Sequence, residues 1–172
     1  MELQSGRLTR ILRHRWVDEG DARRAFPNDS LARIQTRVAA SEQRHSGEIR
    51  VCIEAGLPLS YLWRSLRARD RAITLFGKLR VWDTERNNGV LIYLLLAERA
   101  IEIVADRGLN ARVPAAQWAG ITQGMQHAFR DGQFEAGMNA AVDAVDALLC
   151  AHFARQAGEV DANELPDAPL VG

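Results

Sequence analysis

The most constraining feature of the sequence is an uninterrupted apolar run, residues 90–96, which reads Val-Leu-Ile-Tyr-Leu-Leu-Leu. Gly89 precedes the run, and Glu98 and Arg99 follow it, so turn-forming or charged residues lie at both ends. A run of this length without a polar residue is typical of a strand that is covered on both faces. We therefore predict that residues 90–96 form the central strand of a sheet.

Two further strands are predicted around this one. Residues 101–105 alternate apolar and polar side chains, and the link at 97–99 is so short that it favours an antiparallel hairpin with the central strand. Residues 48–55 alternate in the same way. A helical pattern at 59–79 separates them from the central strand, and a strand–helix–strand unit of this kind has parallel strands. The expected sheet is therefore small and mixed.

The remaining segments predict the layers and the domain limits. Apolar residues at helical spacing mark helices at 6–20, from a cap at 29–30 to 45–47, at 114–131 and at 134–153. We predict an α/β fold, a three-layer α/β/α sandwich with a small mixed sheet (a βαβ unit plus an antiparallel hairpin strand) and C-terminal helices. The expected parts are an N-terminal helical arm at 1–27, an α/β domain at 28–155, and a disordered tail at 156–172 that has four acids and no bases.

Composition restricts the function. The chain has 172 residues with 22 basic and 22 acidic side chains, which suits one domain and gives no overall field that would attract nucleic acid. The longest apolar stretch is about half of the roughly 20 residues that span a membrane, and the start of the chain has no secretory signal. We expect a soluble cytoplasmic protein without a transmembrane segment, in which Cys52 and Cys150 are reduced thiols.

The predicted helix at 59–79 is strongly basic, because arginines or lysines occupy most of its polar positions. This strip is either a solvated outer face or a docking surface for nucleic acid, an acidic membrane surface or the protein's own acidic tail. The lack of interleaved aromatic residues favours the solvated face, and no nucleic-acid partner is expected. One acidic partner would be the tail itself, through Glu159, Asp161, Glu164 and Asp167. The four tryptophans, Trp16, Trp63, Trp82 and Trp118, are interpreted as core anchors, with Trp82 partly exposed because it flanks the polar loop.

Several short motifs carry a family resemblance. They are Asn87-Asn88-Gly89-Val90-Leu91, Arg99 before Ile101-Glu102-Ile103, Asp106-Arg107-Gly108, Trp118, and Phe129-Arg130-Asp131-Gly132-Gln133-Phe134 followed by Gly137. Through them the chain resembles the TPM domain family over roughly residues 30–150. The resemblance implies a three-layer α/β domain, and members are described as acid phosphatases, divalent-ion binders, or assembly and maintenance factors for membrane complexes.

The chain departs from the family pattern in two ways. Many relatives carry a signal peptide and a trailing membrane helix, and neither pattern is seen here. The longer motif of the family also has an acidic residue where this chain reads Asn110-Ala111-Arg112-Val113-Pro114.

Polar side chains cluster at one predicted end of the sheet. Hairpin pairing brings Asn87 and Asn88 next to Asp106 and Arg107. Carboxylate and amide oxygens are the ligands that Ca²⁺ or Mg²⁺ prefers. The candidate metal ligands are Asp83, Glu85, Asn88 and Asp106, and the candidate binding edge adds Trp82, Asn87, Arg107, Glu48 and His45. The alternative is that residues 83–88 are simply a turn held by side-chain bonds to the backbone.

Phosphatase chemistry has weaker support. The sequence has no recognised phosphate-binding loop or nucleophile motif, so only metal-activated water remains as the attacking group. We therefore expect a non-enzymatic module that binds a partner protein or a divalent ion, without an organic cofactor. A weak metal-dependent acid phosphatase is the alternative.

Overall fold

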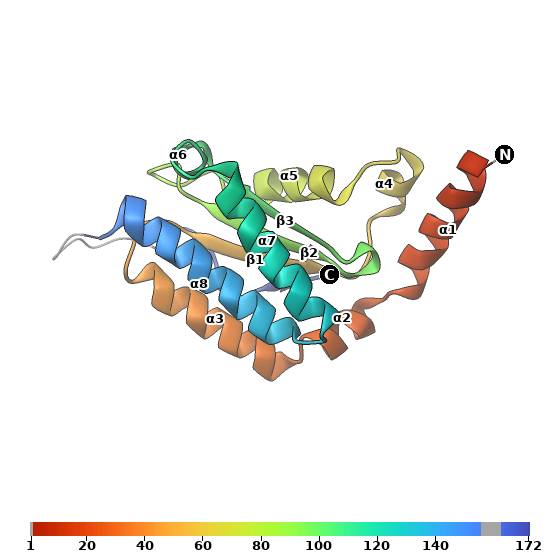
Figure 1. Ribbon diagram of the computed structural model, residues 1–172, viewed down its shortest axis with the longest axis horizontal. Coiled ribbons are helices and arrows are strands. Elements are labelled where there is room, and N and C mark those ends of the chain that lie inside the picture. Colours follow the sequence, from red (N-terminus) through yellow and green to blue (C-terminus); the bar gives the residue numbers. More distant parts are fainter. Residues whose placement is uncertain (1, 156–162) are drawn as a thin grey trace.

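The computed structural model describes residues 2–155 and 163–172. Its elements are α1 (Glu2–Trp16), α2 (Glu19–Ala25), α3 (Asn28–Glu42), β1 (Ile49–Glu54), α4 (Leu59–Trp63), α5 (Ala68–Lys78), β2 (Val90–Leu95), the short 3₁₀ helix η1 (Leu96–Glu98), β3 (Ala100–Ala105), α6 (Arg107–Asn110), α7 (Ala115–Arg130), α8 (Phe134–Phe153) and β4 (Leu170–Val171) (Figure 1).

The sheet has the strand order β3-β2-β1-β4. β1 pairs with β2 in parallel, and β2 pairs with β3 antiparallel with Val90 opposite Ala105. Every residue of β2 is buried, as its unbroken apolar sequence predicts. The structure therefore confirms the mixed sheet with residues 90–95 in a central strand.

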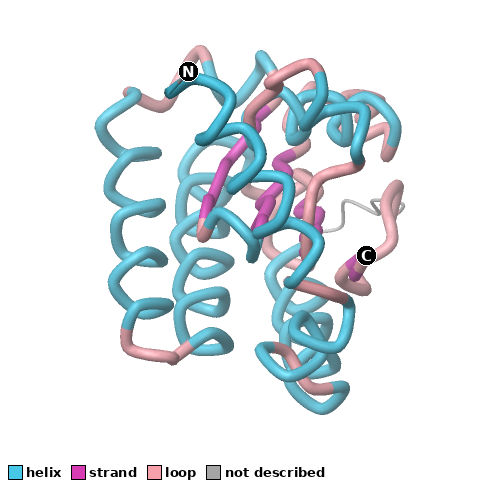
Figure 2. Tube along the Cα trace, turned by 90° about the vertical axis from the view of Figure 1, so that its right-hand side faces the viewer, coloured by secondary structure: helices cyan, strands magenta, loops and turns pink. Residues whose placement is uncertain are grey.

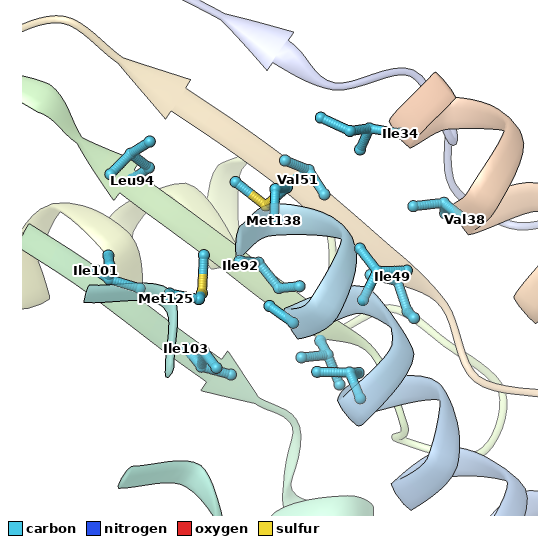
Figure 3. Close-up of a cluster of buried hydrophobic side chains, with 14 of the residues drawn as sticks. Ile34, Val38, Ile49, Val51, Ile92, Leu94, Ile101, Ile103, Met125 and Met138 are labelled. Atoms are coloured by element: carbon cyan, nitrogen blue, oxygen red, sulfur yellow. The ribbon is translucent and has the colours of Figure 1, made fainter. Parts of the chain in front are cut away.

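Helices cover both faces of the sheet, as Figure 2 shows with the strands between two groups of helices. One face packs against α3, α7 and α8, and residues such as Ile34, Ile92 and Met138 form this larger core (Figure 3). The other face packs against α5, with Tyr93 and Leu75 in a second cluster. The predicted α/β fold, with its three α/β/α layers, is thus confirmed.

The prediction of one continuous helix at 59–79 is wrong. The chain forms α4 and α5 instead, and Ser65 between them has a φ of 55°, in the left-handed region that a helix cannot contain. The break changes which side of the second helix faces the sheet. Ala72 and Leu75 are buried there, whereas Ile73, expected on the apolar side, is 53% exposed.

Trp16 and Trp63 are not core anchors, contrary to the prediction, whereas Trp82 is partly exposed beside the polar loop, as the interpretation of this residue allowed. Trp16, Trp63 and Trp82 are 82%, 63% and 51% exposed, and Trp118 alone packs against the core. Phenylalanines take the anchoring role: Phe26 is fully buried and meets Phe129 and Phe134 edge-on, with ring centroids 6.3 and 5.8 Å away.

The prediction of a disordered tail is wrong for residues 163–172. β4 pairs in parallel with β1, and Leu165 is buried in the cluster around α5. The Arg50 guanidinium donates to the carbonyl oxygens of Pro166 and Ala168, the latter at 2.6 Å. These contacts satisfy the open edge of β1, which the sequence pattern alone leaves unpaired.

The acidic residues of the tail do not pair with the basic helix as far as the chain is described. Glu164 accepts a hydrogen bond from the Glu85 N–H, and Asp167 accepts one from the Asn163 side chain. Glu159 and Asp161 lie outside the described residues. The tail instead meets the α5 side of the sheet through the apolar Leu165.

Candidate functional site at the polar rim of the sheet

The predicted polar cluster forms at one end of the sheet. We define the polar rim as residues 45–48, 82–89 and 106–108. The Asp106 N–H donates to the Gly89 carbonyl at 2.8 Å, and the Gly108 N–H donates to the Asn87 carbonyl at 2.9 Å. The Arg107 Nε also donates to Asn87 Oδ1 at 3.1 Å. The hairpin therefore places the loop before β2 beside the turn after β3, as its register requires.

Two glycines allow this close packing. A Cβ at Gly89 would lie 2.0 Å from the Val81 carbonyl oxygen, and one at Gly108 would lie 2.4 Å from the Asn87 carbonyl oxygen. Both distances are far below van der Waals contact with rigid backbone atoms. Glycine at these two positions is therefore a packing requirement of the rim.

Asn88 joins the loop to the start of β1. Its side chain is fully buried, its Nδ2 donates to the Ser46 carbonyl at 3.0 Å, and its backbone N–H donates to Thr84 Oγ1 at 3.1 Å. Asn88 Oδ1 is buried and has no hydrogen-bond partner among the described residues. The described chain thus leaves the oxygen of this amide unsatisfied.

Asp106 begins α6 at the other side of the rim. Its Oδ1 accepts the Arg107 N–H at 2.6 Å, which caps the helix. Its second carboxylate oxygen, Oδ2, is buried and also lacks a hydrogen-bond partner in the described part of the chain. Two oxygens on neighbouring segments of the rim therefore lack a donor among residues 2–155 and 163–172.

The loop carboxylates of the predicted metal set are exposed. Asp83 Oδ2 lies 3.9 Å from Arg80 Nε, and the nearby Trp82 ring is held by a 3.3 Å hydrogen bond from its Nε1 to the Gly77 carbonyl. Glu85 is also exposed. Across residues 2–155 and 163–172, the structure shows no group of three or more His, Cys, Asp or Glu side chains arranged to hold a metal ion.

His45 and Glu48 have structural contacts at the rim. His45 is fully buried, with Nε2 3.4 Å from Asp146 Oδ1, and burial lowers its pKa. The Glu48 carboxylate accepts the N–H groups of Glu164 and Leu165 at 3.2 and 3.3 Å. Glu48 therefore positions the tail, a role that sequence reasoning did not predict.

Sequence reasoning also missed the two hydroxyl residues that hold Asn88. Thr84 and Ser46 are both buried, and Thr84 stands four residues before Asn88 in the loop. A short hydroxyl side chain preceding an Asn-Asn-Gly turn is a recognisable signal for a side-chain bond to the backbone. That signal predicts the role of Thr84. The contact of Ser46 with Asn88 depends on the pairing of β1 with β2, which a local motif does not reveal.

Fold and rim together define a class of protein, a small three-layer α/β domain with its polar turns gathered at one end of a mixed sheet. A sequence profile of the TPM domain matches residues 21–148. The chain therefore belongs to the TPM domain family. No match was found among curated proteins.

Solved structures show the same fold. The BA42 protein from the psychrophilic bacterium Bizionia argentinensis, determined by NMR, is 27% identical with a TM-score of 0.73 over 84% of this chain and 93% of its own. The N-terminal domain of a protein from P. gingivalis is 20% identical with a TM-score of 0.55, over 75% of this chain and 81% of its own. No helix within the described residues has the length and apolar character to span a membrane.

Proposed function

We propose that this TPM domain is a non-enzymatic binding module that takes a divalent cation, Ca²⁺ or Mg²⁺, or a partner protein at the polar rim. The observation that carries the proposal is a pair of buried oxygens, Asn88 Oδ1 and Asp106 Oδ2, that accept no hydrogen bond from any described residue. An unsatisfied buried oxygen costs free energy, and a hard cation would supply the missing partner.

The chemistry of the donors fits such an ion. Asn88 supplies an amide oxygen and Asp106 a carboxylate oxygen, and both types are ligands for Ca²⁺ and Mg²⁺. Asp83 and Glu85 are exposed on the adjoining loop; the described carboxylates are not gathered as a group of three in the unbound structure, so the loop would have to close on the ion for them to complete the set. A bound cation would give the two buried oxygens an electrostatic partner.

A partner protein would meet the exposed side of the same rim. Trp82 presents half of its surface to solvent beside the acidic loop, and exposed tryptophan is enriched at the centres of protein interfaces. Binding of a cation would change the charge that this surface presents. Cation and partner binding would therefore be coupled at one site.

Weak metal-dependent phosphatase activity is the alternative. Burial raises the pKa of the Cys52 thiol to about 12, so that thiol stays protonated at neutral pH and is a poor nucleophile. Catalysis would therefore depend on cation-activated water at the rim. We expect no turnover of a chromogenic phosphate ester beyond the buffer rate. Hydrolysis that Asp106→Asn abolishes would favour the phosphatase instead.

Isothermal titration calorimetry with Ca²⁺ and Mg²⁺ tests the binding proposal. Asp106→Asn removes the charge but keeps an N-cap acceptor for the Arg107 N–H, so the fold should persist. We expect wild-type protein to bind at least one cation and the variant to bind at least about tenfold more weakly. Asp131→Asn, at an exposed position at the end of α7, should bind as wild type. Equal affinity of Asp106→Asn and wild type would contradict the proposal.

A further inference from the structure

A second site lies at the opposite end of the sheet, where β2 ends and β3 begins. A cavity of about 1060 Å³ opens there between the α1–α2 segment, the turn of the β2–β3 hairpin and the last turn of α7. Figure 1 shows these three segments meeting at the end of the molecule from which α1 extends. Carboxyl ends of parallel strands are the usual place for ligands in open α/β sheets. We call this cavity the arginine pocket.

The floor of the arginine pocket is apolar. It includes Leu94 and Ile101, which are 1% and 7% exposed, together with Leu96, Phe129 and Phe134. The volume reaches the upper end of the range of roughly 300–1,000 Å³ that holds small organic ligands. The pocket could therefore bury an apolar body well beyond the size of a simple inorganic ion.

The mouth of the pocket is basic. Among the described residues, four arginines, Arg13, Arg24, Arg99 and Arg130, line it together with two acids. Asp21 already pairs with Arg24. Glu98 already accepts hydrogen bonds from Arg10 at 2.6 Å and His14 at 2.9 Å.

Three guanidinium groups of the pocket consequently have no carboxylate partner among the described side chains. Arg130 bonds only to the neutral Gln126 carbonyl and the His127 ring, and Arg13 and Arg99 make no ion pair within that part of the chain. Arg99 also has a φ of 50°, a left-handed conformation that usually favours glycine. The hairpin turn thus holds a charged side chain at a strained position at the mouth.

The wall made by α1 is fixed to the hairpin. His14 is buried, accepts the Leu57 N–H at Nδ1 at 2.9 Å, and therefore presents its Nε2–H to Glu98. With Arg10 on the same carboxylate, α1 is joined to the turn that carries Arg99. The pocket is therefore formed in the absence of a ligand, which reduces the entropic cost of binding.

We propose that the arginine pocket binds a small amphipathic anion, an acid with a single anionic head and an apolar chain. The unpaired guanidinium groups would hold a carboxylate or phosphate head, because their planar donor arrangement matches either group. The apolar floor would bury the chain. This site is separate from the polar rim and goes beyond the cation-binding proposal.

Binding of decanoate, decyl phosphate and decanol to the full chain, followed by calorimetry, tests this proposal. We expect decanoate or decyl phosphate to bind, and the tighter of the two identifies the preferred head group. Acetate, which lacks the chain, and decanol, which lacks the charge, should each bind at least about tenfold more weakly. Failure of both anions to bind, or equal binding of decanol, would overturn the proposal.

Charge variants locate the site. The Arg99→Gln/Arg130→Gln double variant should lose at least about tenfold in affinity for the anion while its decanol binding is unchanged. Lys78→Gln removes an exposed charge on α5, away from the pocket, and should bind as wild type. Chemical shift changes on adding decanoate should concentrate at residues 94–101 and 126–134. Undiminished anion binding by the double variant would overturn the assignment.

Discussion

At the scale of single residues, the polar rim depends on close backbone contact. Gly89 lies where the chain from α5 passes over the start of β2, and the Val81 carbonyl leaves no room for a side chain there. The same contact places Asn88 against Ser46 and the Gly89 carbonyl against Asp106. A methyl group at this position would therefore separate the two sides of the rim.

Gly89→Ala should destabilise the protein by about 2 kcal/mol or more, because its Cβ would meet a rigid carbonyl oxygen. Gly124→Ala is the matched control, since a Cβ there meets nothing within 4 Å in the middle of α7. The control should be neutral or stabilise by up to about 1 kcal/mol. Urea denaturation of both variants checks this. Equal stabilities would show that the contact at Gly89 is not tight.

Glu42 makes the stability depend on pH. Burial raises the pKa of its carboxyl from 4.5 to about 9, the Ile49 N–H bond at 2.8 Å opposes the rise, and the charges of Glu48 and Asp167 add to it. The folded state therefore holds a proton that the unfolded state releases above pH 4.5. Stability from this group is complete below about pH 4.5 and falls as the pH rises toward 9.

Glu42→Gln should remove much of this pH dependence, because an amide keeps the acceptor for Ile49 without ionising. At pH 8 the variant should be more stable than wild type, by an amount on the order of a few kcal/mol. Below pH 4.5 the two proteins should be similar. Thermal unfolding from pH 4 to 9 measures the difference, and parallel curves across that range would contradict the assignment.

At the scale of elements, the C-terminal segment completes the sheet. β4 covers the open edge of β1, the Arg50 guanidinium binds two tail carbonyls, and Glu48 binds two tail N–H groups. Leu165 is the apolar anchor, at 7% exposure. The tail is therefore part of the folded domain at residues 163–172.

Leu165→Ala should destabilise the fold by about 2–3 kcal/mol, because it empties a buried position in the cluster around α5. Leu170→Ala, at 38% exposure within β4, should cost less than about 1 kcal/mol. Guanidinium denaturation of the two variants gives the comparison. If Leu165→Ala cost no more than Leu170→Ala, the tail would not be anchored as described.

The attachment of α1 is a second element-scale feature. Glu98→Gln weakens the charge-assisted bonds from Arg10 and His14, and hydrogen exchange should become faster in residues 8–16 while β2 stays protected. Glu102→Gln, whose carboxylate meets Arg69 at 3.4 Å, is the control and should leave α1 unchanged. Unaltered exchange in α1 would argue against this attachment.

At the scale of the whole molecule, the sequence predicts contacts between segments that are close along the chain and misses contacts between segments that are far apart. The hairpin and the meeting of Asn87 with Arg107 follow from a short turn and alternation, and both are present. The pairing of β4 with β1 depends on partners more than a hundred residues apart, so composition wrongly indicated disorder. The face that α5 buries depends on the backbone at Ser65, which residue spacing does not encode.

The candidate site is likewise predictable in its local features and not in its packing. Residue types in the loops indicated oxygen ligands, and strand register brought Asn88 near Asp106. Which of these oxygens lack a donor among the described residues depends on three-dimensional packing. The Asn88 amide donates to the Ser46 carbonyl, and one Asp106 oxygen accepts the Arg107 N–H, so that Asn88 Oδ1 and Asp106 Oδ2 are left over. Within the described part of the chain, the two polar ends of the sheet thus differ in chemistry. The rim has oxygen acceptors without donors, and the arginine pocket has guanidinium groups without carboxylate partners.

Amide-resolved NMR during a Ca²⁺ titration tests the central claim, that the polar rim binds a divalent cation. We predict saturable shifts of the amides at 83–89 and 106–108, much smaller changes at 94–101, and loss of the response in Asp106→Asn. Unchanged amide chemical shifts at the rim up to millimolar Ca²⁺ and Mg²⁺ would contradict the claim.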